Sequence, residues 1–322
     1  MPLIDLATQN ILSPMVLFFV LGAAVTFARS DLAIPGAVAK LLALYLMMSI
    51  GFRGGAEVAH NGLTPTLAAA IGAGLLLSFA TPFVAFALLR SMTRLSAVDA
   101  ASVAAHYGSI SAVTLVAIMS TLTQLAIPYE GFMIAVAAVM ETPAILSGLL
   151  LARTKSSGES RKELVREIVL NGAVVMLLGS FAIGAIAGAR GFTLLKPFIV
   201  DSFAGFLCLF LLDMGLVAGR GLRDGWRALS PSVVAFAVVM PLIGGAAAAA
   251  LSPLVGLSTG GTAVLITLAA SASYIAVPAA MRLALPQANP AIPLSLSLGI
   301  TFPFNLLFGI PLYIAAAQRI AA

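Results

Sequence analysis

Long apolar runs alternate with short polar connections along this chain. A helix needs about 20 mainly apolar residues to cross the hydrocarbon core of a bilayer. Ten runs meet that requirement, and the connections between most of them are short. We therefore predict ten transmembrane helices, at roughly 11–28, 33–51, 63–89, 98–124, 130–152, 168–189, 194–218, 228–251, 261–284 and 290–317.

The pattern also predicts an internal repeat. The strongly polar connection 153–167 divides the chain into a first half, 1–152, and a second half, 168–322, with five predicted helices each. Three short stretches recur in both halves at offsets of 164, 162 and 160 residues, namely Gly51 with Gly215, Ser109 with Ser271, and Pro143 with Pro303. Because five is odd, the second copy must enter the membrane upside down, which is typical of secondary transporters.

The composition agrees with a polytopic membrane protein. The 322 residues are 61% hydrophobic and 9% charged, with a mean hydropathy of +1.10, whereas soluble domains are about a quarter charged. No basic patch with interleaved aromatic residues indicates nucleic acid binding. The sequence has a single cysteine, Cys208, so an intrachain disulfide is excluded.

Basic residues gather on one side of the predicted bundle. Alternating connections place thirteen on one side and four on the other, and the richer side is expected to be cytoplasmic. We therefore predict a multi-pass protein of the bacterial inner (plasma) membrane with both termini periplasmic. The first 28 residues hold no lysine or arginine, so the first run is read as a retained span. The larger set is Arg29, Lys40, Arg90, Arg94, Arg153, Lys155, Arg161, Lys162, Arg166, Arg220, Arg223, Arg227 and Arg282; the smaller is Arg53, Arg190, Lys196 and Arg319.

Two predicted spans have polar centres. "HYGSIS" in the fourth and "SASYIAVP" in the ninth combine small residues, hydroxyls and a glycine or proline, as a discontinuous helix requires. A half-helix that starts there offers free N–H groups and a partial positive charge to a small anion. The hydroxyls of Ser109, Ser111, Ser271 and Ser273 would add donors. The alternative is that these small residues only permit close helix packing.

Two carboxylates fall inside predicted spans, where a charge costs about 2.5–3.5 kcal/mol. Glu141 and Asp213 could each hold a sodium ion or carry a proton, or could sit near a helix end and reach water or a neighbouring helix. The neutral oxygen ligands available beside them are Thr114, Thr142, Thr301 and Asn305.

The two histidines, His60 and His106, allow several roles. His106 could shuttle a proton, anchor a substrate or simply pack; with His60 it supplies too few ligands for a metal site. An intramembrane serine hydrolase using Ser109 or Ser111 would need a base within hydrogen-bond reach, but His106 is on the same helix and His60 is expected in a loop, together with Glu57 and Asn61. A membrane sensor that does not transport is a further alternative, although no soluble domain is appended.

Five stretches together resemble the sodium-dependent bicarbonate permease family, the SbtA-like bicarbonate transporters. They are "GFRGGAEVAHNG", "DAASVAAHYGSISAVT", "METPAIL", "FAGFLCLFLLDMG" and "AASASYIAVPAAMRLALPQANPAIPLSLSLGITFPFNLLFGIPLY". The resemblance implies an all-α polytopic membrane protein with ten transmembrane helices in two inverted five-helix repeats, broken helices four and nine, a core and a gate domain, and a homotrimer. It also implies sodium-coupled uptake of bicarbonate, with the substrate at Gly108, Ser109, Ser111 and the segment Ser271, Ala272, Ser273.

The sequence departs from cyanobacterial members in four places. Tyr274 stands where they carry an aspartate, Ala112-Val113 where they carry Gly-Ser, and Asp213 where they carry an apolar residue. The linker 153–167 is shorter than theirs. It lies on the side where a trimeric PII-like regulator docks in those systems, so the resemblance implies a PII-like cytoplasmic regulator as a further partner.

We therefore predict a secondary active transporter, not an enzyme, that works by alternating access and needs no cofactor beyond sodium as the coupling ion. Bicarbonate is the expected substrate, and another small carboxylate with sodium or proton coupling is the alternative. The predicted ion ligands are Thr114, Glu141, Asp213, Tyr274 and Asn305.

Overall fold

The computed structural model describes residues 8, 12–62, 64–152, 172–225, 230–274, 277–278, 281, 285 and 287–320. Every regular element in these ranges is helical. Eight helices there are long and apolar enough to cross a membrane, and two shorter apolar helices accompany them. The prediction of an all-helical polytopic membrane protein is thus confirmed. The linker 153–167 lies outside the described residues.

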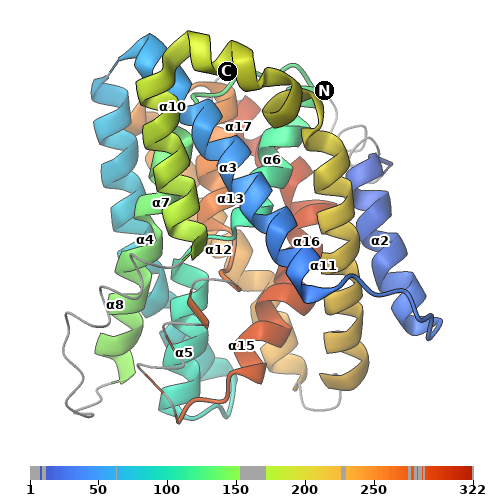
Figure 1. Ribbon diagram of the computed structural model, residues 1–322. Helices are drawn as coiled ribbons and strands as arrows, with labels where there is room; N and C mark the ends of the chain where they lie inside the picture. Colours follow the sequence, from blue (N-terminus) through green and yellow to red (C-terminus); the bar gives the residue numbers. More distant parts are fainter. Residues whose placement is uncertain are drawn as a thin grey trace.

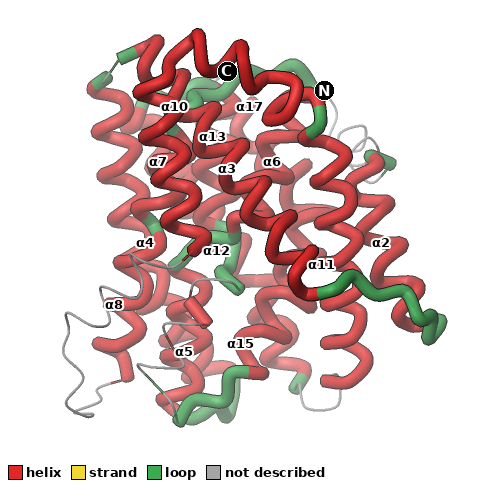
Figure 2. The backbone as a smooth tube through the Cα atoms, in the orientation of Figure 1, coloured by secondary structure: helices red, strands yellow, loops and turns green. Residues whose placement is uncertain are grey.

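The helices cross the molecule from one end to the other in a closely packed bundle (Figures 1 and 2). We call the end at the top of Figure 1, where α3 and α17 end, the upper face, and the opposite end, where α4 ends and α5 begins, the lower face. In chain order the elements are α2 (Pro14–Phe27), α3 (Gly36–Asn61), α4 (Pro65–Met92), α5 (Ala97–Gly108), α6 (Ala112–Gln124), α7 (Met133–Val139), α8 (Glu141–Ala152), α10 (Gly172–Lys196), η1 (Pro197–Asp201), α11 (Phe203–Gly225), α12 (Pro231–Val255), α13 (Thr259–Ala269), α15 (Ala291–Leu296), η3 (Ser297–Thr301), α16 (Phe302–Phe304), η4 (Asn305–Gly309) and α17 (Ile310–Ile320).

Four helices form a peripheral group, which we define as α2, α3, α10 and α11. Within this group α2 packs mainly on α11 and α3 mainly on α10. Glycines at each crossing let the backbones approach, as in other membrane helix pairs. A Cβ on Gly55 would overlap the Phe181 carbonyl, and one on Gly184 would overlap that of Phe52.

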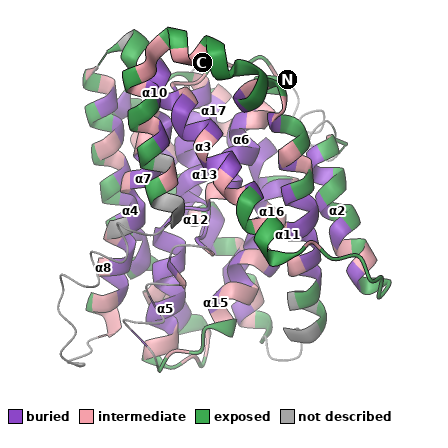
Figure 3. Cartoon of the chain, in the orientation of Figure 1, coloured by how far each residue is buried: buried purple, intermediate pink, exposed green. Residues whose placement is uncertain are grey.

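The α2–α11 crossing has the same construction. A Cβ on Gly22 would overlap the Leu212 carbonyl, and one on Gly215 would overlap that of Phe19. In all four cases the overlapped carbonyl belongs to the residue three positions before the partner glycine. The remaining helices, which we call the main body, surround α5, α6 and α13, whose residues are the most completely buried of the bundle (Figure 3).

Two predicted boundaries are wrong. The second span was expected to end near residue 51, but α3 continues to Asn61, so His60 lies in its exposed last turn and not in a loop. The sixth span was expected to end near residue 189, and the helical path does break at Gly188, where φ is 56°. The seventh span was expected to begin at 194, but α11 begins at Phe203. After the break at Gly188 the chain runs along the upper face before α11 descends (Figure 1).

Prolines explain the irregular last span. A proline inside a helix removes one N–H and clashes with the carbonyl four residues before it. Pro303 and Pro311 each follow or overlap a wider π-helical turn, Ser297–Thr301 and Asn305–Gly309. These turns re-aim the side chains they contain, among them Thr301 and Asn305, and turns of this type are frequent at functional sites.

We expect Gly184→Ala to destabilise the protein by about 1–3 kcal/mol, because the added methyl group overpacks the α3–α10 crossing. Gly179→Ala is the matched control on the same helix, since its Cβ would meet no atom within 4 Å. Thermal unfolding of the purified protein in detergent compares the two variants. Equal midpoints would contradict a tight crossing at Gly184.

Candidate functional site

The helical path is interrupted between α5 and α6. Helix α5 starts from a capping arrangement in which Ser96 accepts a hydrogen bond from Asp99 N and donates one to the Asp99 carboxylate. It ends at Gly108, where a Cβ would collide with the ring of Pro82. Ser109 and Ser111 have extended backbone angles, with ψ values of 169° and 111°, and α6 then begins at Ala112.

A second non-helical segment follows α13. This helix starts at a Ser258 cap and ends at Ala269, and residues 271–273 are buried and non-helical. Most residues from 275 to 286, which are the second half of the predicted ninth span, lie outside the described residues.

The two segments are in direct contact. Ser273 N donates to the carbonyl of His106 at 2.8 Å, and Ser111 N donates to Ser271 Oγ at 2.9 Å. Backbone groups that leave a helix inside a membrane need such partners, because lipid offers none. The predicted substrate residues Gly108, Ser109, Ser111, Ser271, Ala272 and Ser273 are therefore buried side by side near mid-height of the bundle.

The hydroxyls of the four serines in these segments take part in different hydrogen bonds. Ser109 donates to Glu141 Oε2 at 2.5 Å, and Ser271 donates to the Leu268 carbonyl at 2.8 Å, so both of these protons are committed. Ser111 Oγ accepts from Thr114 N, and Ser273 Oγ accepts from Val277 N at a long 3.4 Å. Within the described residues neither of the latter two hydroxyls donates a hydrogen bond, so their protons remain available to an incoming anion.

The start of α6 adds backbone donors. The first N–H groups of a helix lack intrahelical partners, and the helix dipole places about half a positive charge there. Ser111 caps Thr114 N, while the N–H groups of Ala112 and Val113 make no hydrogen bond within the described part of the chain. This end of α6 thus has the chemistry of a small-anion site.

Glu141 lies beside this site. Its side chain is 8% exposed, and the Ser109 hydroxyl fixes one carboxylate oxygen. Thr114 is 1% exposed, and its hydroxyl has no hydrogen-bond partner in the part of the chain that the structure describes. Carboxylate and hydroxyl oxygens suit hard cations such as sodium. The Thr142 side chain, also considered as a ligand, lies outside the described side chains.

Asn305 and Thr301 stabilise the site by donating hydrogen bonds to backbone carbonyls of neighbouring helices. Asn305 Nδ2 donates to the Ala270 carbonyl at the end of α13, while Tyr313 donates to Asn305 Oδ1. Thr301 donates to the Ala237 carbonyl, so the Tyr107 hydroxyl, 2.7 Å away, must donate to Thr301. The two tyrosines were missed from the sequence; a tyrosine in a buried span needs a polar partner, which was the available signal.

Asp213 is not brought to the serine segments. It is 4% exposed on α11, seven residues from Phe206 and from Arg220 and thus on one helical stripe with them. The Phe206 ring packs on Tyr45 of α3, so that stripe faces α3. Within the described residues Asp213 makes no hydrogen bond to residues 108–111 or 271–273.

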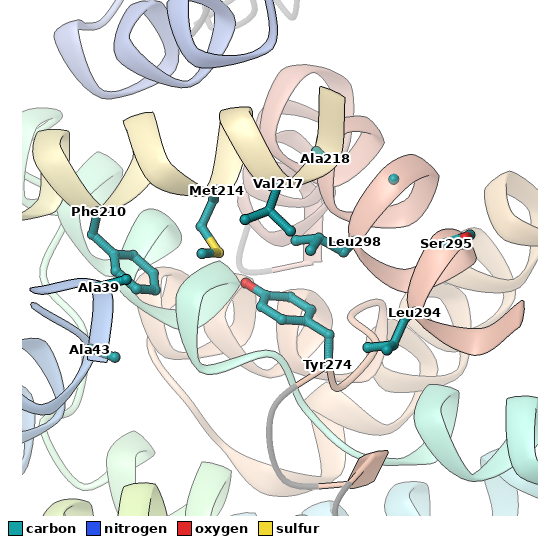
Figure 4. Close-up of a pocket in the computed structure, with 11 residues that line it drawn as sticks. Ala39, Ala43, Phe210, Met214, Val217, Ala218, Tyr274, Leu294, Ser295 and Leu298 are labelled. Atoms are coloured by element: carbon teal, nitrogen blue, oxygen red, sulfur yellow. The ribbon is translucent and has the colours of Figure 1, made fainter. Parts of the chain in front are cut away.

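Tyr274 projects from the second segment toward α11. Figure 4 places its hydroxyl close to Met214 in a cavity of about 400 Å³ between the peripheral group and the main body. The hydroxyl lies near the Ser111 side chain but makes no hydrogen bond with ordinary geometry. The cavity is mostly apolar, and its lining includes Ala39, Ala43, Phe210, Val217, Leu294 and Leu298.

His106 does not form a catalytic pair. Its Nδ1 lies 2.7 Å from the Ser102 carbonyl and therefore carries a proton, and its buried Nε2 has no hydrogen-bond partner among the described residues. It lines a small cavity of about 70 Å³ with Ser102, Pro278 and Met281. No hydrogen bond joins His106 to the hydroxyl of Ser109 or Ser111, which a hydrolase would require.

Comparison with known families gives one match. A family model described as the Na⁺-dependent bicarbonate transporter superfamily matches residues 14–318. No curated protein matches the chain. The match covers both non-helical segments and all the site residues named above.

We expect Asn305→Asp to destabilise the protein by about 1–3 kcal/mol, because it replaces the donor to the buried Ala270 carbonyl with an acceptor. Tyr313→Phe is the control, since it removes the bond to Oδ1 and leaves the Ala270 contact intact. Thermal unfolding measures both variants. A larger loss of stability in Tyr313→Phe would contradict the stabilising role of the bond from Asn305 to Ala270.

Proposed function

The chain belongs to the Na⁺-dependent bicarbonate transporter superfamily, and we propose that it takes up bicarbonate together with sodium by alternating access. A transporter family excludes the serine hydrolase alternative. The observation that carries the proposal is the contact between the two non-helical segments. Within the described residues it leaves the hydroxyl protons of Ser111 and Ser273 and the first N–H groups of α6 without acceptors.

The anion would bind at this contact. Bicarbonate is a small oxyanion that accepts several hydrogen bonds, and two hydroxyls with a helix N-terminus supply them. Ser109 and Ser271 would hold the segments in place, since their protons are already donated to Glu141 and Leu268.

Sodium would bind beside the anion, with Glu141 and Thr114 as the best-supported ligands. Their oxygens are buried, and the anion and cation would lower each other's desolvation cost in a site of low dielectric. Asn305, Tyr274 and Asp213 remain predicted ion ligands; the contacts of Asn305 and the position of Asp213 favour other roles for these two.

Helix crossings support two inverted five-helix repeats, 1–152 and 168–322. Gly22 and Gly184 are 162 residues apart in the sequence, and Gly55 and Gly215 are 160 apart. One crossing joins Gly22 to Gly215 and the other joins Gly55 to Gly184, so each contains one glycine from each pair. At both crossings the overlapped carbonyl belongs to the residue three positions before the partner glycine. This geometry pairs Gly215 with Gly55, one turn beyond the Gly51 match made from the sequence. We propose ten spans, with α5–α6 and α13 onward as broken helices four and nine.

The peripheral group would act as the gate domain and the main body as the core domain. The cavity at Tyr274 lies between them and adjoins the serine segments, so it offers a route toward the site when one group moves past the other. We further propose that the protein is a homotrimer in the inner membrane. The lower face would be cytoplasmic, because Arg29, Arg90, Arg94 and Arg220 lie toward that end. A PII-like regulator at this face stays a prediction.

A larger carboxylate is the second candidate substrate. The cavity of about 400 Å³ beside Tyr274 has room for more than bicarbonate, and its lining is apolar. Uptake of a panel of labelled small carboxylates into the same proteoliposomes distinguishes the two substrates.

We expect reconstituted protein to take up labelled bicarbonate only with sodium outside, and Ser273→Ala to raise KM for bicarbonate about tenfold, or ~1.4 kcal/mol. The variant should unfold at the wild-type temperature, because the hydrogen bond it loses is long. Ser271→Ala is the contrasting variant and should lose stability, since Ser271 bonds both Ser111 and Leu268. Normal kinetics in Ser273→Ala would contradict the anion site.

We expect Glu141→Gln to raise KM for sodium about tenfold, because the amide removes the negative charge that attracts the ion. Asp213→Asn is the matched control and should leave the sodium dependence unchanged. Sodium titration of uptake at saturating bicarbonate measures both. A shift in Asp213→Asn alone would assign the ion to α11.

A further inference from the structure

A second cavity, with more polar residues in its lining, lies between the peripheral group and the main body, toward the upper face. Its volume is about 200 Å³, and its walls come from α3, the end of α6, the start of α7 and the start of α11. The polar residues that line it are Arg53, Ser120, Thr123, Gln124 and Tyr129. This cavity is separate from the one at Tyr274, with which it shares no lining residue.

Arg53 is the charged group of this cavity. It lies within the membrane span of α3, where an arginine is costly and usually faces a wet cavity or a partner. Its guanidinium carbon sits 5.9 Å from the centre of the Phe203 ring, a cation–π contact that holds the group at the α3–α11 boundary. None of the described residues that line the cavity is a carboxylate, and Arg53 forms no ion pair with any described side chain.

The neighbouring polar side chains are also uncommitted. Ser120, Gln124 and Tyr129 make no side-chain hydrogen bond within the described residues, whereas Thr123 bonds back to Met119. A guanidinium with a hydroxyl, an amide and a phenol around an open cavity can attract and hydrogen-bond a small oxyanion. Basic clefts of this kind raise the local anion concentration.

We propose that the Arg53 cavity is an anion-collecting vestibule, a second binding site for a small monovalent oxyanion on the path from the upper face to the serine segments. This inference rests on the proposed uptake of an anion and adds a second anion-binding site to the transport path. Arg53 attracts the anion by charge, and Ser120, Gln124 and Tyr129 replace part of its hydration. The vestibule has no role in sodium binding, because a cation would be repelled there.

A thiol probe tests the vestibule without relying on transport. In a Cys208→Ala background, Ser120→Cys places one thiol in the cavity, and its reaction rates with anionic and cationic methanethiosulfonates are each divided by those of a free thiol. We expect the anionic reagent to be favoured at least about tenfold, and bicarbonate to slow its reaction. Arg53→Gln should abolish the preference, while Arg190→Gln, which removes an exposed arginine outside the cavity, should keep it.

Two further variants guard against a merely structural role. Arg53→Lys keeps the charge and should keep most of the preference even if the Phe203 contact weakens. Glu57→Gln asks whether the carboxylate one turn along α3 is the true partner of Arg53, and it should leave the preference intact or increase it. An equal charge preference with and without Arg53 would overturn the proposal.

Transport kinetics separate this inference from the proposed function. Arg53→Gln should raise KM for bicarbonate about tenfold with little change in kcat or in the sodium dependence. Uptake with an unchanged KM in this variant would overturn the vestibule and leave the transporter intact. Failure of the wild-type protein to take up bicarbonate would refute the proposed function, while the thiol assay would still report on the cavity.

Discussion

Two hydrogen bonds between segments far apart in the chain hold the centre of this protein together: Ser111 N to Ser271 Oγ, and Ser273 N to the His106 carbonyl. Backbone that leaves a helix within a bilayer must find partners in protein or water. Each non-helical segment supplies hydrogen-bond partners to the backbone of the other, so neither would be stable alone in lipid. Among the described residues, the first N–H groups of α6 and two hydroxyl protons have no acceptor, and these are the groups that we propose bind the anion.

The rest of the main body stabilises that contact. Asn305 holds the last carbonyl of α13, Tyr313 holds Asn305, and Thr301 links Tyr107 with α12. Ser109 joins α5 to Glu141 at the start of α8. These bonds connect the last span to the ends of α5 and α13 and the fifth span to Ser109, so a polar centre inside an apolar bundle has a fixed shape.

The peripheral group is built in a different way. Its helices approach each other closely at Gly22, Gly55, Gly184 and Gly215. A few side-chain hydrogen bonds to backbone carbonyls, such as Thr26 to Leu216 and Ser180 to Met47, accompany these approaches. The two cavities lie where this group meets the main body, one toward each face. An interface with cavities is easier to slide than a packed one, which fits a movement of one group past the other.

The sequence by itself determined the class of fold and the place of the site. Apolar runs of span length, polar centres at "HYGSIS" and "SASYIAVP", and the similarity of the two halves follow from local composition, because lipid penalises every unpaired polar group. Only the tertiary structure decided which hydroxyls are committed and that Glu141, and not Asp213, bonds Ser109. It also decided that Arg53 faces a cavity whose described lining residues include no carboxylate. Those outcomes depend on distances between residues remote in the chain, which helical periodicity does not encode.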